Sequence, residues 1–332
     1  MNILELFLNV VLMFLLMVPG FILKKAKLVG DGFGKGVSNL VLYIAQPVLV
    51  FMAYIKPFDA AVLINSLWVL LFSFVAHFAF FGVSMAFFGK AEEDKRRMLR
   101  FATIFSNAAF MGIPLIDALY PGGPEVLYAS IYNITFNIFL WTLGVRLCTQ
   151  GRDIDGDGEC DGEELRKKGG ASWLLVLYHP VTVAAVLGLI MFVTPLSEYF
   201  GEGNVLYDTL ACIKALVAPL SMLVIGIRLA EVDLKGFFTD KHFYIFAMLR
   251  HLLLPLIVVA VMRVMALLLP IPDEVIMVVA ILASTPAASS AVMFAERYEC
   301  DAKYTSKVVA VSTILSIATM PLIIFLAGIG LG

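Results

Sequence analysis

The chain has 332 residues, of which 61% are hydrophobic and 15% are charged, and its mean hydropathy is +0.93. These values exclude an ordinary soluble globular protein and indicate a chain whose solvent is a lipid bilayer. A formal net charge of −2 leaves no excess of basic surface for a nucleic acid partner, and the four cysteines lack the spacing of a disulfide framework or a zinc site.

Ten apolar runs, each bounded by charged residues or by clusters of proline and glycine, predict an all-α polytopic membrane protein with ten transmembrane helices. The first run has no basic segment before it and is followed by Lys24, Lys25 and Lys27, so we interpret it as a membrane helix and not as a cleaved signal peptide. The predicted spans cover residues 4–23, 36–55, 61–88, 101–119, 126–148, 173–194, 205–229, 242–269, 275–295 and 307–329.

Basic residues mark one side of the predicted membrane domain. Most of the 24 Lys and Arg residues lie in or beside the odd-numbered connections, whereas the even-numbered connections hold only Lys56. Because basic loops stay in the cytoplasm, this bias predicts a multi-pass protein of the cell membrane whose two termini are both non-cytoplasmic.

Two halves of five helices each are expected, because a five-helix unit that is repeated once must insert the opposite way up. The predicted first repeat covers residues 1–149, and the second covers residues 172–332, joined by a cytoplasmic loop at 150–171. Pro47 in the second span and Pro219 in the seventh occupy corresponding places, although prolines are common in transmembrane helices.

The fourth span contains polar and helix-breaking residues where lipid would surround the chain. Its segment FSNAAFMGIPL, residues 105–115, holds Ser106, Asn107, Gly112 and Pro114. A backbone that cannot keep its helical hydrogen bonds in a bilayer must line a protein-walled cavity. These four residues are therefore candidates for substrate binding.

The ninth span carries a second interruption, ILASTPAASSA, at residues 281–291. Interrupted spans in corresponding positions of two halves point to a secondary transporter. Serines in such a helix can also bond to their own backbone or allow close packing, and that alternative stays open. The substrate-binding candidates here are Thr285, Pro286, Ser289 and Ser290, with Ser284 beside them.

Three further polar residues lie within spans. Asn133 and Asn137 are one helical turn apart in the fifth span, where they either contact substrate or hold helices together. Arg250 lies deep in the eighth span, and the sequence offers it no mid-span carboxylate. We expect it to contact an anionic substrate, with snorkelling or contact to main-chain carbonyls as the alternatives.

The segments FSNAAFMGIPL and STPAASSAVMFAERY resemble the auxin efflux carrier family, including its plant PIN-type members. YNITFNIFLWTLG, YHPVTVAAVLGLI and APLSMLVIGIRLA extend the similarity over nearly the whole chain outside the central loop. The resemblance implies two inverted five-helix repeats, with a scaffold of spans 1, 2, 6 and 7 and a transport part formed by the other six, similar to bile acid:sodium symporters. It also implies that the fourth and ninth helices unwind and cross beside the substrate.

By this resemblance Asn107 matches the family's crossover asparagine and Pro286 its ninth-span proline. One departure is Ser106, which stands where PIN-type carriers have a proline directly before that asparagine. The expected fourth-span break is then looser, or centred nearer Gly112 and Pro114. A second departure is His179, which replaces the family's usual asparagine.

The central loop contains DIDGDGECDGEE, whose oxygen-bearing side chains have the spacing of an EF-hand calcium loop. Cys160 stands where that motif usually has an aliphatic residue, and an acidic, solvated linker is the alternative. The candidate Ca²⁺ ligands are Asp153, Asp155, Asp157, Glu159, Asp161 and Glu164.

Taken together, these patterns predict a secondary active transporter of small organic anions such as carboxylates or auxin-like acids, working by alternating access. The alternatives are a sodium-coupled symporter of bile-acid-like substrates and a membrane sensor that retains a transporter fold. An enzyme is not expected, since the chain has no HExxH or GxSxG motif and no mid-span carboxylate pair. We expect no required cofactor, and the central loop is a candidate Ca²⁺ site. The coupling ion, H⁺ or Na⁺, and the formation of a homodimer stay open.

Overall fold

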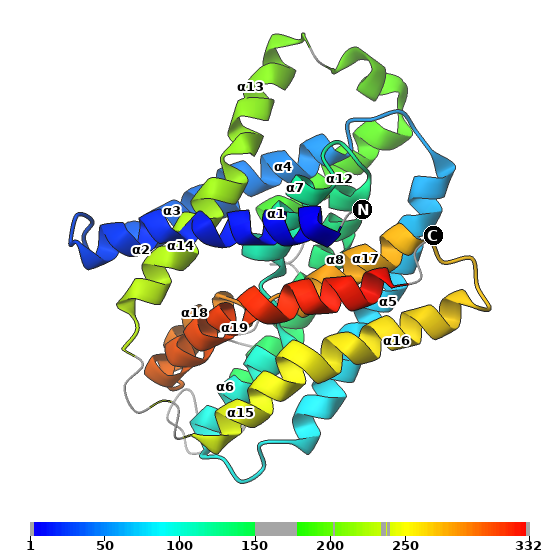
Figure 1. Ribbon diagram of the computed structural model, residues 1–332. Helices are drawn as coiled ribbons and strands as arrows, with labels where there is room; N and C mark the ends of the chain where they lie inside the picture. Colours follow the sequence, from blue (N-terminus) through cyan, green and yellow to red (C-terminus); the bar gives the residue numbers. More distant parts are fainter. Residues whose placement is uncertain (1–2, 150–177, 202, 234–236, 238–239, 330–332) are drawn as a thin grey trace, which may run out of the picture.

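The computed structural model describes residues 3–149, 178–201, 203–233, 237 and 240–329. The central loop at 150–171, with all six candidate Ca²⁺ ligands, lies outside the described residues. Within the described residues the regular structure is helical, and Figure 1 shows the helices crossing one another in a bundle. Seven of these helices are long and apolar enough to cross a membrane. The predicted multi-pass helical membrane protein is therefore confirmed.

The seven long helices are built from one or more consecutive segments. The predicted runs at 101–119 and 275–295, and the described part of the run at 173–194, correspond to shorter helices. The α-helices are α1 (Ile3–Leu15), α2 (Met17–Lys25), α3 (Phe33–Leu40), α4 (Gln46–Ala53), α5 (Ala60–Ala86), α6 (Glu93–Ile104), α7 (Ile113–Leu119), α8 (Glu125–Phe139), α9 (Val145–Thr149), α12 (Pro180–Val193), α13 (Val205–Ala215), α14 (Val217–Glu231), α15 (Lys241–Met248), α16 (Leu254–Ala266), α17 (Asp273–Ser284), α18 (Ser290–Arg297) and α19 (Ala302–Gly328). The π-helical turns are η1 (Val41–Ala45), η2 (Ala108–Gly112), η3 (Leu140–Gly144) and η6 (Leu249–Leu253), and η4 (Pro195–Tyr199) is a 3₁₀ turn.

Three of the π-helical turns end two residues before a proline: Pro47 follows η1, Pro114 follows η2 and Pro255 follows η6. A proline within a helix has no N–H, and its ring clashes with the carbonyl four residues earlier, which in each case belongs to the π-helical turn. Widening that turn relieves the clash without ending the helix. Proline positions therefore account for three of the four π-helical turns among the described residues.

The helices pack as two groups. In the first group α2 and α3 pack on α14, and α12 and α13 pack on α4. In the second group α5 packs on α6 and α8, while α17 packs on α8, α16 and α19. The first group occupies the upper part of Figure 1, and α5, α6, α15, α16, α18 and α19 occupy the lower part. The two groups meet where α7 and η2 contact α1 and α14, and where α4 contacts α8.

Close approach of α2 and α14 depends on two glycines. A Cβ added to Gly20 would lie 2.1 Å from the Leu223 carbonyl oxygen, and one added to Gly226 would lie 2.0 Å from the Met17 carbonyl oxygen. Neither backbone could yield, so only glycine fits at these positions. In a bilayer the hydrophobic effect does not drive helices together, because lipid tails are as apolar as the side chains. Small residues at a crossing instead stabilise the pair by letting the two backbones come close enough for extensive van der Waals contact.

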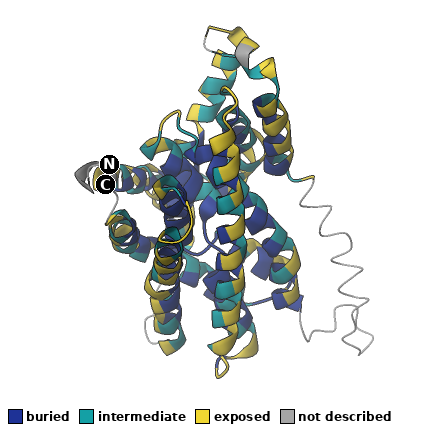
Figure 2. Cartoon of the chain, turned by 90° about the vertical axis from the view of Figure 1, so that its right-hand side faces the viewer, coloured by how far each residue is buried: buried dark blue, intermediate teal, exposed yellow. Residues whose placement is uncertain are grey.

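Apolar side chains remain exposed on the outward faces of the bundle, including Leu67 and Phe78 on α5 and Val186 on α12. Figure 2 shows such exposed residues along the outer faces of helices, with buried residues gathered between them. An apolar surface of this kind is suited to lipid contact.

Candidate functional site at two interrupted helices

The fourth and ninth predicted spans are each interrupted, and the two interruptions lie side by side. One falls between the end of α6 and the start of η2, and the other falls between α17 and α18. The Asn107 amide donates to the Pro286 carbonyl at 2.8 Å, and the Ala288 amide donates to the Phe105 carbonyl at 2.9 Å. Ser106 and Ala287 thereby form an antiparallel bridge. We call residues 105–107 and 285–289 the paired interruption.

The fourth-span break is centred on residues 105–107, and not near Gly112 and Pro114 as one sequence expectation had it. Gly112 ends the π-helical turn η2, and Pro114 follows in α7, where the helix widens at η2 and continues past the proline without a break. A Cβ on Gly112 would lie 2.6 Å from Leu282 Cδ2, so this glycine allows η2 to approach α17. Both residues therefore shape the packing beside the paired interruption.

Arg250 joins the carboxyl ends of the two helices that lead into the paired interruption. Its side chain is fully buried, and its guanidinium donates from Nη2 to the Thr285 carbonyl at 2.8 Å and from Nη1 to the Thr103 carbonyl at 3.4 Å. These carbonyls lie at the C-terminal ends of α17 and α6, where the helix dipole is negative. The guanidinium also lies over the Phe80 ring, 5.5 Å from its centroid.

The same guanidinium has no carboxylate within 4 Å among the described residues, and its Nε is buried without a hydrogen-bond partner. Burying a cation costs free energy unless other groups compensate. Here the two helix carboxyl ends and the aromatic ring supply that compensation. Of the alternatives raised by the sequence, the structure has Arg250 in contact with main-chain carbonyls.

The other two helix ends at the paired interruption are amino ends. Here η2 begins at Ala108 and α18 begins at Ser290, so the first amides of each helix lack an intrahelical acceptor and carry partial positive charge. Ser289 and Ser290 are partly exposed, although residues 281–288 before them are buried.

Three side chains around these amino ends hold buried polar atoms without a hydrogen-bond partner: Ser106 Oγ, Asn107 Nδ2 and Ser290 Oγ. The Tyr132 hydroxyl lies near that of Ser106, but the two do not make a hydrogen bond of normal geometry. Unsatisfied buried donors are uncommon, because each costs on the order of 1–3 kcal/mol. Their presence together suits a site that a polar ligand completes.

Asn133 and Asn137 lie on one face of α8 and are both buried. Asn137 Nδ2 donates to the Asn133 carbonyl at 2.9 Å, while Asn133 Oδ1 has no partner. Ser130, one turn earlier on the same face, hydrogen-bonds with the Tyr54 hydroxyl at 2.8 Å. Of this polar stripe, Ser130 therefore contacts the first group of helices, through the residue that follows α4.

Ser284 and Thr285 are satisfied within their own helix. Ser284 Oγ donates to the Ile281 carbonyl at 2.9 Å, and Thr285 Oγ1 donates to the Leu282 carbonyl at 2.8 Å. Back-bonding of this kind leaves the hydroxyl proton engaged. At this end of α17 the polar group that bonds outside its own helix is the Thr285 main-chain carbonyl, which accepts from Arg250.

Comparison with known families decides what kind of protein this arrangement belongs to. A family model described as membrane transport protein matches residues 6–324, which is nearly the whole chain. The chain belongs to this family of membrane transport proteins. The match confirms the resemblance to auxin efflux carriers that the sequence motifs indicated. No curated protein matches the chain.

In this membrane transport protein Gln46 is a site residue that sequence reasoning missed. It is fully buried, its Nε2 donates to the Ala109 carbonyl at 2.9 Å, and its Oε1 has no partner. Because Gln46 belongs to α4 and Ala109 to η2, this bond joins the two groups of helices beside the paired interruption. The signal that could have found it is a lone amide within an apolar span, directly before Pro47.

His251 is linked to the paired interruption by hydrogen bonds through Ser312. The Ala287 amide donates to Ser312 Oγ at 2.9 Å, and Ser312 Oγ hydrogen-bonds with His251 Nε2 at 2.9 Å. His251 Nδ1 hydrogen-bonds with Thr319 Oγ1, whose own proton goes to the Leu315 carbonyl. Each donor in this chain has an acceptor when the histidine is neutral and protonated on Nδ1. The geometry therefore gives His251 a supporting role.

Proposed function

We propose that this membrane transport protein is a secondary active carrier of small organic anions, such as carboxylates, which it moves across the cell membrane by alternating access. The observation that carries the proposal is the paired interruption, where two helix amino ends meet buried side chains that lack partners. Broken helices of this kind suit substrate binding because they offer main-chain groups and dipole ends within the membrane.

An anion is favoured by the charges around the paired interruption. Arg250 compensates the two negative helix ends, so the positive ends at Ala108 and Ser290 stay without a counter-charge among the described residues. A carboxylate would accept hydrogen bonds from Asn107 Nδ2, from the Ser106 or Ser290 hydroxyl, and from free amides of η2 or α18. Asn133 and Asn137 would line the side of the site that faces the first helix group.

Movement of one helix group against the other would give alternating access. We assign the ten predicted spans to two inverted five-helix repeats, with the broken fourth and ninth helices crossing at the paired interruption and both termini outside the cytoplasm. Polar contacts between the groups would have to open during the cycle. They include the ion pair of Lys214 with Asp117 at 2.9 Å and the bond from Lys56 Nζ to the Gly123 carbonyl at 2.8 Å.

Sodium-coupled symport of bile-acid-like carboxylates is the second transport candidate. The described residues contain no group of three His, Cys, Asp or Glu side chains that could hold a metal ion. A sodium ion would then depend on carbonyl and hydroxyl oxygens of the kind that the paired interruption provides.

The experiment is a thermal-shift screen of small carboxylates on the purified protein, followed by flux of the best labelled hit into proteoliposomes. Flux measured with an imposed sodium gradient, and then with a proton gradient, assigns the coupling ion. Asn107→Ala should lose flux, while Ser284→Ala, whose hydroxyl is satisfied within α17, should keep it. Binding without net flux would support a sensor and overturn the carrier proposal.

A further inference from the structure

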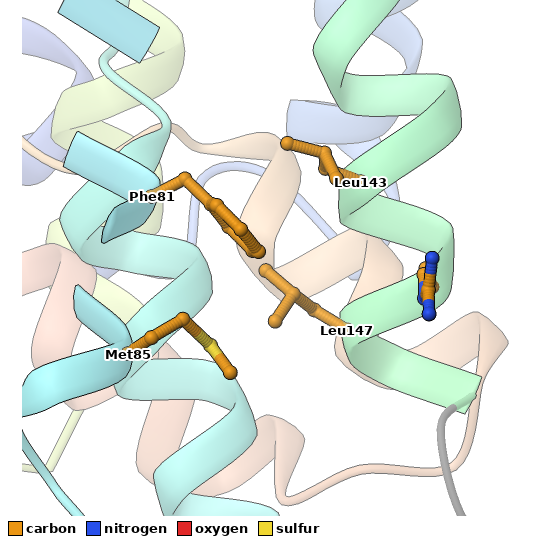
Figure 3. A pocket seen from close by; sticks show the side chains of 5 residues that line it. Phe81, Met85, Leu143 and Leu147 are labelled. Carbon is orange, nitrogen blue, oxygen red and sulfur yellow. The ribbon is translucent and has the colours of Figure 1, made fainter. Parts of the chain in front are cut away.

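A hollow of about 250 Å³ opens at the surface of the second helix group, where Met85 and Arg146 are exposed, and none of its lining residues belongs to the paired interruption. Figure 3 shows Phe81 and Met85 on α5 facing Leu143 and Leu147 on the helix formed by η3 and α9. Arg146 also lines the hollow. We call this hollow the α5–α9 groove.

The α5–α9 groove exists because the two helices are close at one level and diverge at the next. The Phe139 ring stacks on His77 with centroids 5.1 Å apart and meets the Phe78 ring edge-on at 4.9 Å. One to two turns further along both helices, the facing side chains are Phe81 and Met85 on α5 and Leu143 and Leu147 on the other helix, which line the groove. Gly82 lies between Phe78 and Met85 on α5, and a Cβ there would meet nothing within 4 Å.

The open end of the groove carries two arginines. Arg146 is exposed and lines the groove directly. Arg100 reaches the same end from α6, because its Nη2 donates to the Met85 carbonyl at 3.1 Å. Neither guanidinium is within 4 Å of a carboxylate in the part of the chain that is described, whereas Arg97 pairs with Glu93. Two cations therefore sit beside an apolar slot without an acidic partner.

We propose that the α5–α9 groove binds an anionic phospholipid, with an acyl chain along Phe81, Met85, Leu143 and Leu147 and the phosphate on Arg146 and Arg100. An apolar slot on a lipid-facing surface is filled by an acyl chain at no cost in polar desolvation. Charge complementarity selects the headgroup, because basic pockets between membrane helices bind anionic lipid heads. The groove lies at the end of α5 that leads into α6, and residues 90–100 there carry five basic and three acidic side chains, a net positive charge toward which anionic headgroups would gather.

Bound lipid at this place would fill the gap between the diverging ends of α5 and α9. The expected consequence is higher thermal stability in bilayers that contain anionic lipid. This proposal does not depend on which solute is carried, since no residue of the groove belongs to the paired interruption.

The test is native mass spectrometry of the full-length protein with phosphatidylglycerol or phosphatidylcholine of matched chains, together with melting in nanodiscs of each lipid. We expect preferential retention of phosphatidylglycerol, reduced about fivefold by Arg146→Gln and again by Arg100→Gln. Leu143→Trp should reduce retention of both lipids by filling the slot. The control Arg96→Gln changes an arginine that lies near Glu93, and it should leave the preference intact.

Equal retention of the two lipids, or a preference unchanged in both arginine variants, would overturn the proposal. Protection by inorganic phosphate alone equal to that of phosphatidylglycerol would also overturn it, because the groove would then be a free-anion site. If Leu143→Trp fails to fold, the two arginine variants still decide the outcome.

Discussion

Replacing Asn107 with alanine should separate ligand binding from stability. The Asn107 amide and carbonyl already bond to Pro286, Met111 and Gly112, and those backbone bonds survive the substitution. The Asn107 side chain is only 3% exposed, and its Nδ2 has no hydrogen-bond partner among the described residues. Removing an unpaired buried donor recovers on the order of 1–3 kcal/mol, and the lost packing of the amide costs a similar amount. The free energy of unfolding should therefore change by less than about 1 kcal/mol.

Transport should respond much more strongly. If Nδ2 donates to the substrate carboxylate, its loss removes a charge-assisted hydrogen bond of about 1.5–3 kcal/mol, which corresponds to roughly 10- to 150-fold weaker apparent affinity. The assay is initial uptake of labelled carboxylate by proteoliposomes below saturation, with melting of the same variant in detergent. A variant that melts far below the wild type while its uptake is unchanged would show that Asn107 is structural, and would refute this reasoning.

Three further predictions concern packing, helix ends and pH. Gly226→Ala should lower the melting temperature, since its Cβ would meet the opposing backbone of α2, while the control Gly82→Ala should not. Arg250→Lys keeps the charge but cannot bridge two carbonyls, so we expect a loss of about 1–3 kcal/mol, and wild-type melting would contradict the capping role. Burial raises the pKa of Asp240, but hydrogen bonds from Tyr304 and the His242 amide outweigh it, so the pKa is lowered from 3.8. The wild type should therefore melt at a higher temperature than Asp240→Asn, with the full difference above pH 3.8 and a shrinking difference as the pH falls toward the lower pKa of the folded state. A difference in melting temperature that stays constant down to pH 3 would show that the Asp240 carboxylate does not stabilise the fold in this way.

The helical membrane class followed from composition and run length alone, because a bilayer forces the backbone of each span into hydrogen bonds within itself. The position of the irregular turns was less accessible. Pro255 is visible in the sequence, but its effect falls four residues earlier, on the turn that contains Arg250 and His251. Likewise Pro114 suggested a break at its own position, whereas the chain leaves the helix at residues 105–107. A proline widens a turn when neighbouring helices hold it, and that support is tertiary.

In the candidate site, the residue types could be predicted from single segments of the sequence, but the contacts between distant segments could not. Asn107 and Pro286 could be picked out because each is a helix-breaking or polar residue in an apolar run. That they bond to each other across 179 positions of sequence could not be read from either run. The partners of Arg250 were equally hidden, because they are main-chain carbonyls 147 and 35 positions away and leave no mark in side-chain chemistry. Gln46 was overlooked for the same reason, since its acceptor is the Ala109 carbonyl.

Four helix ends meet at the paired interruption, and their charges are not balanced alike. The carboxyl ends of α6 and α17 share the guanidinium of Arg250, which is fully buried. The amino ends of η2 and α18 have no fixed acidic partner among the described residues, so their positive potential stays uncompensated. A site that must bind and then release its ligand benefits from this asymmetry, since a permanent carboxylate would compete with the substrate. We therefore expect an aspartate introduced at Ser290 to abolish anion uptake while leaving the fold intact, and uptake that persists in Ser290→Asp would place the anion elsewhere.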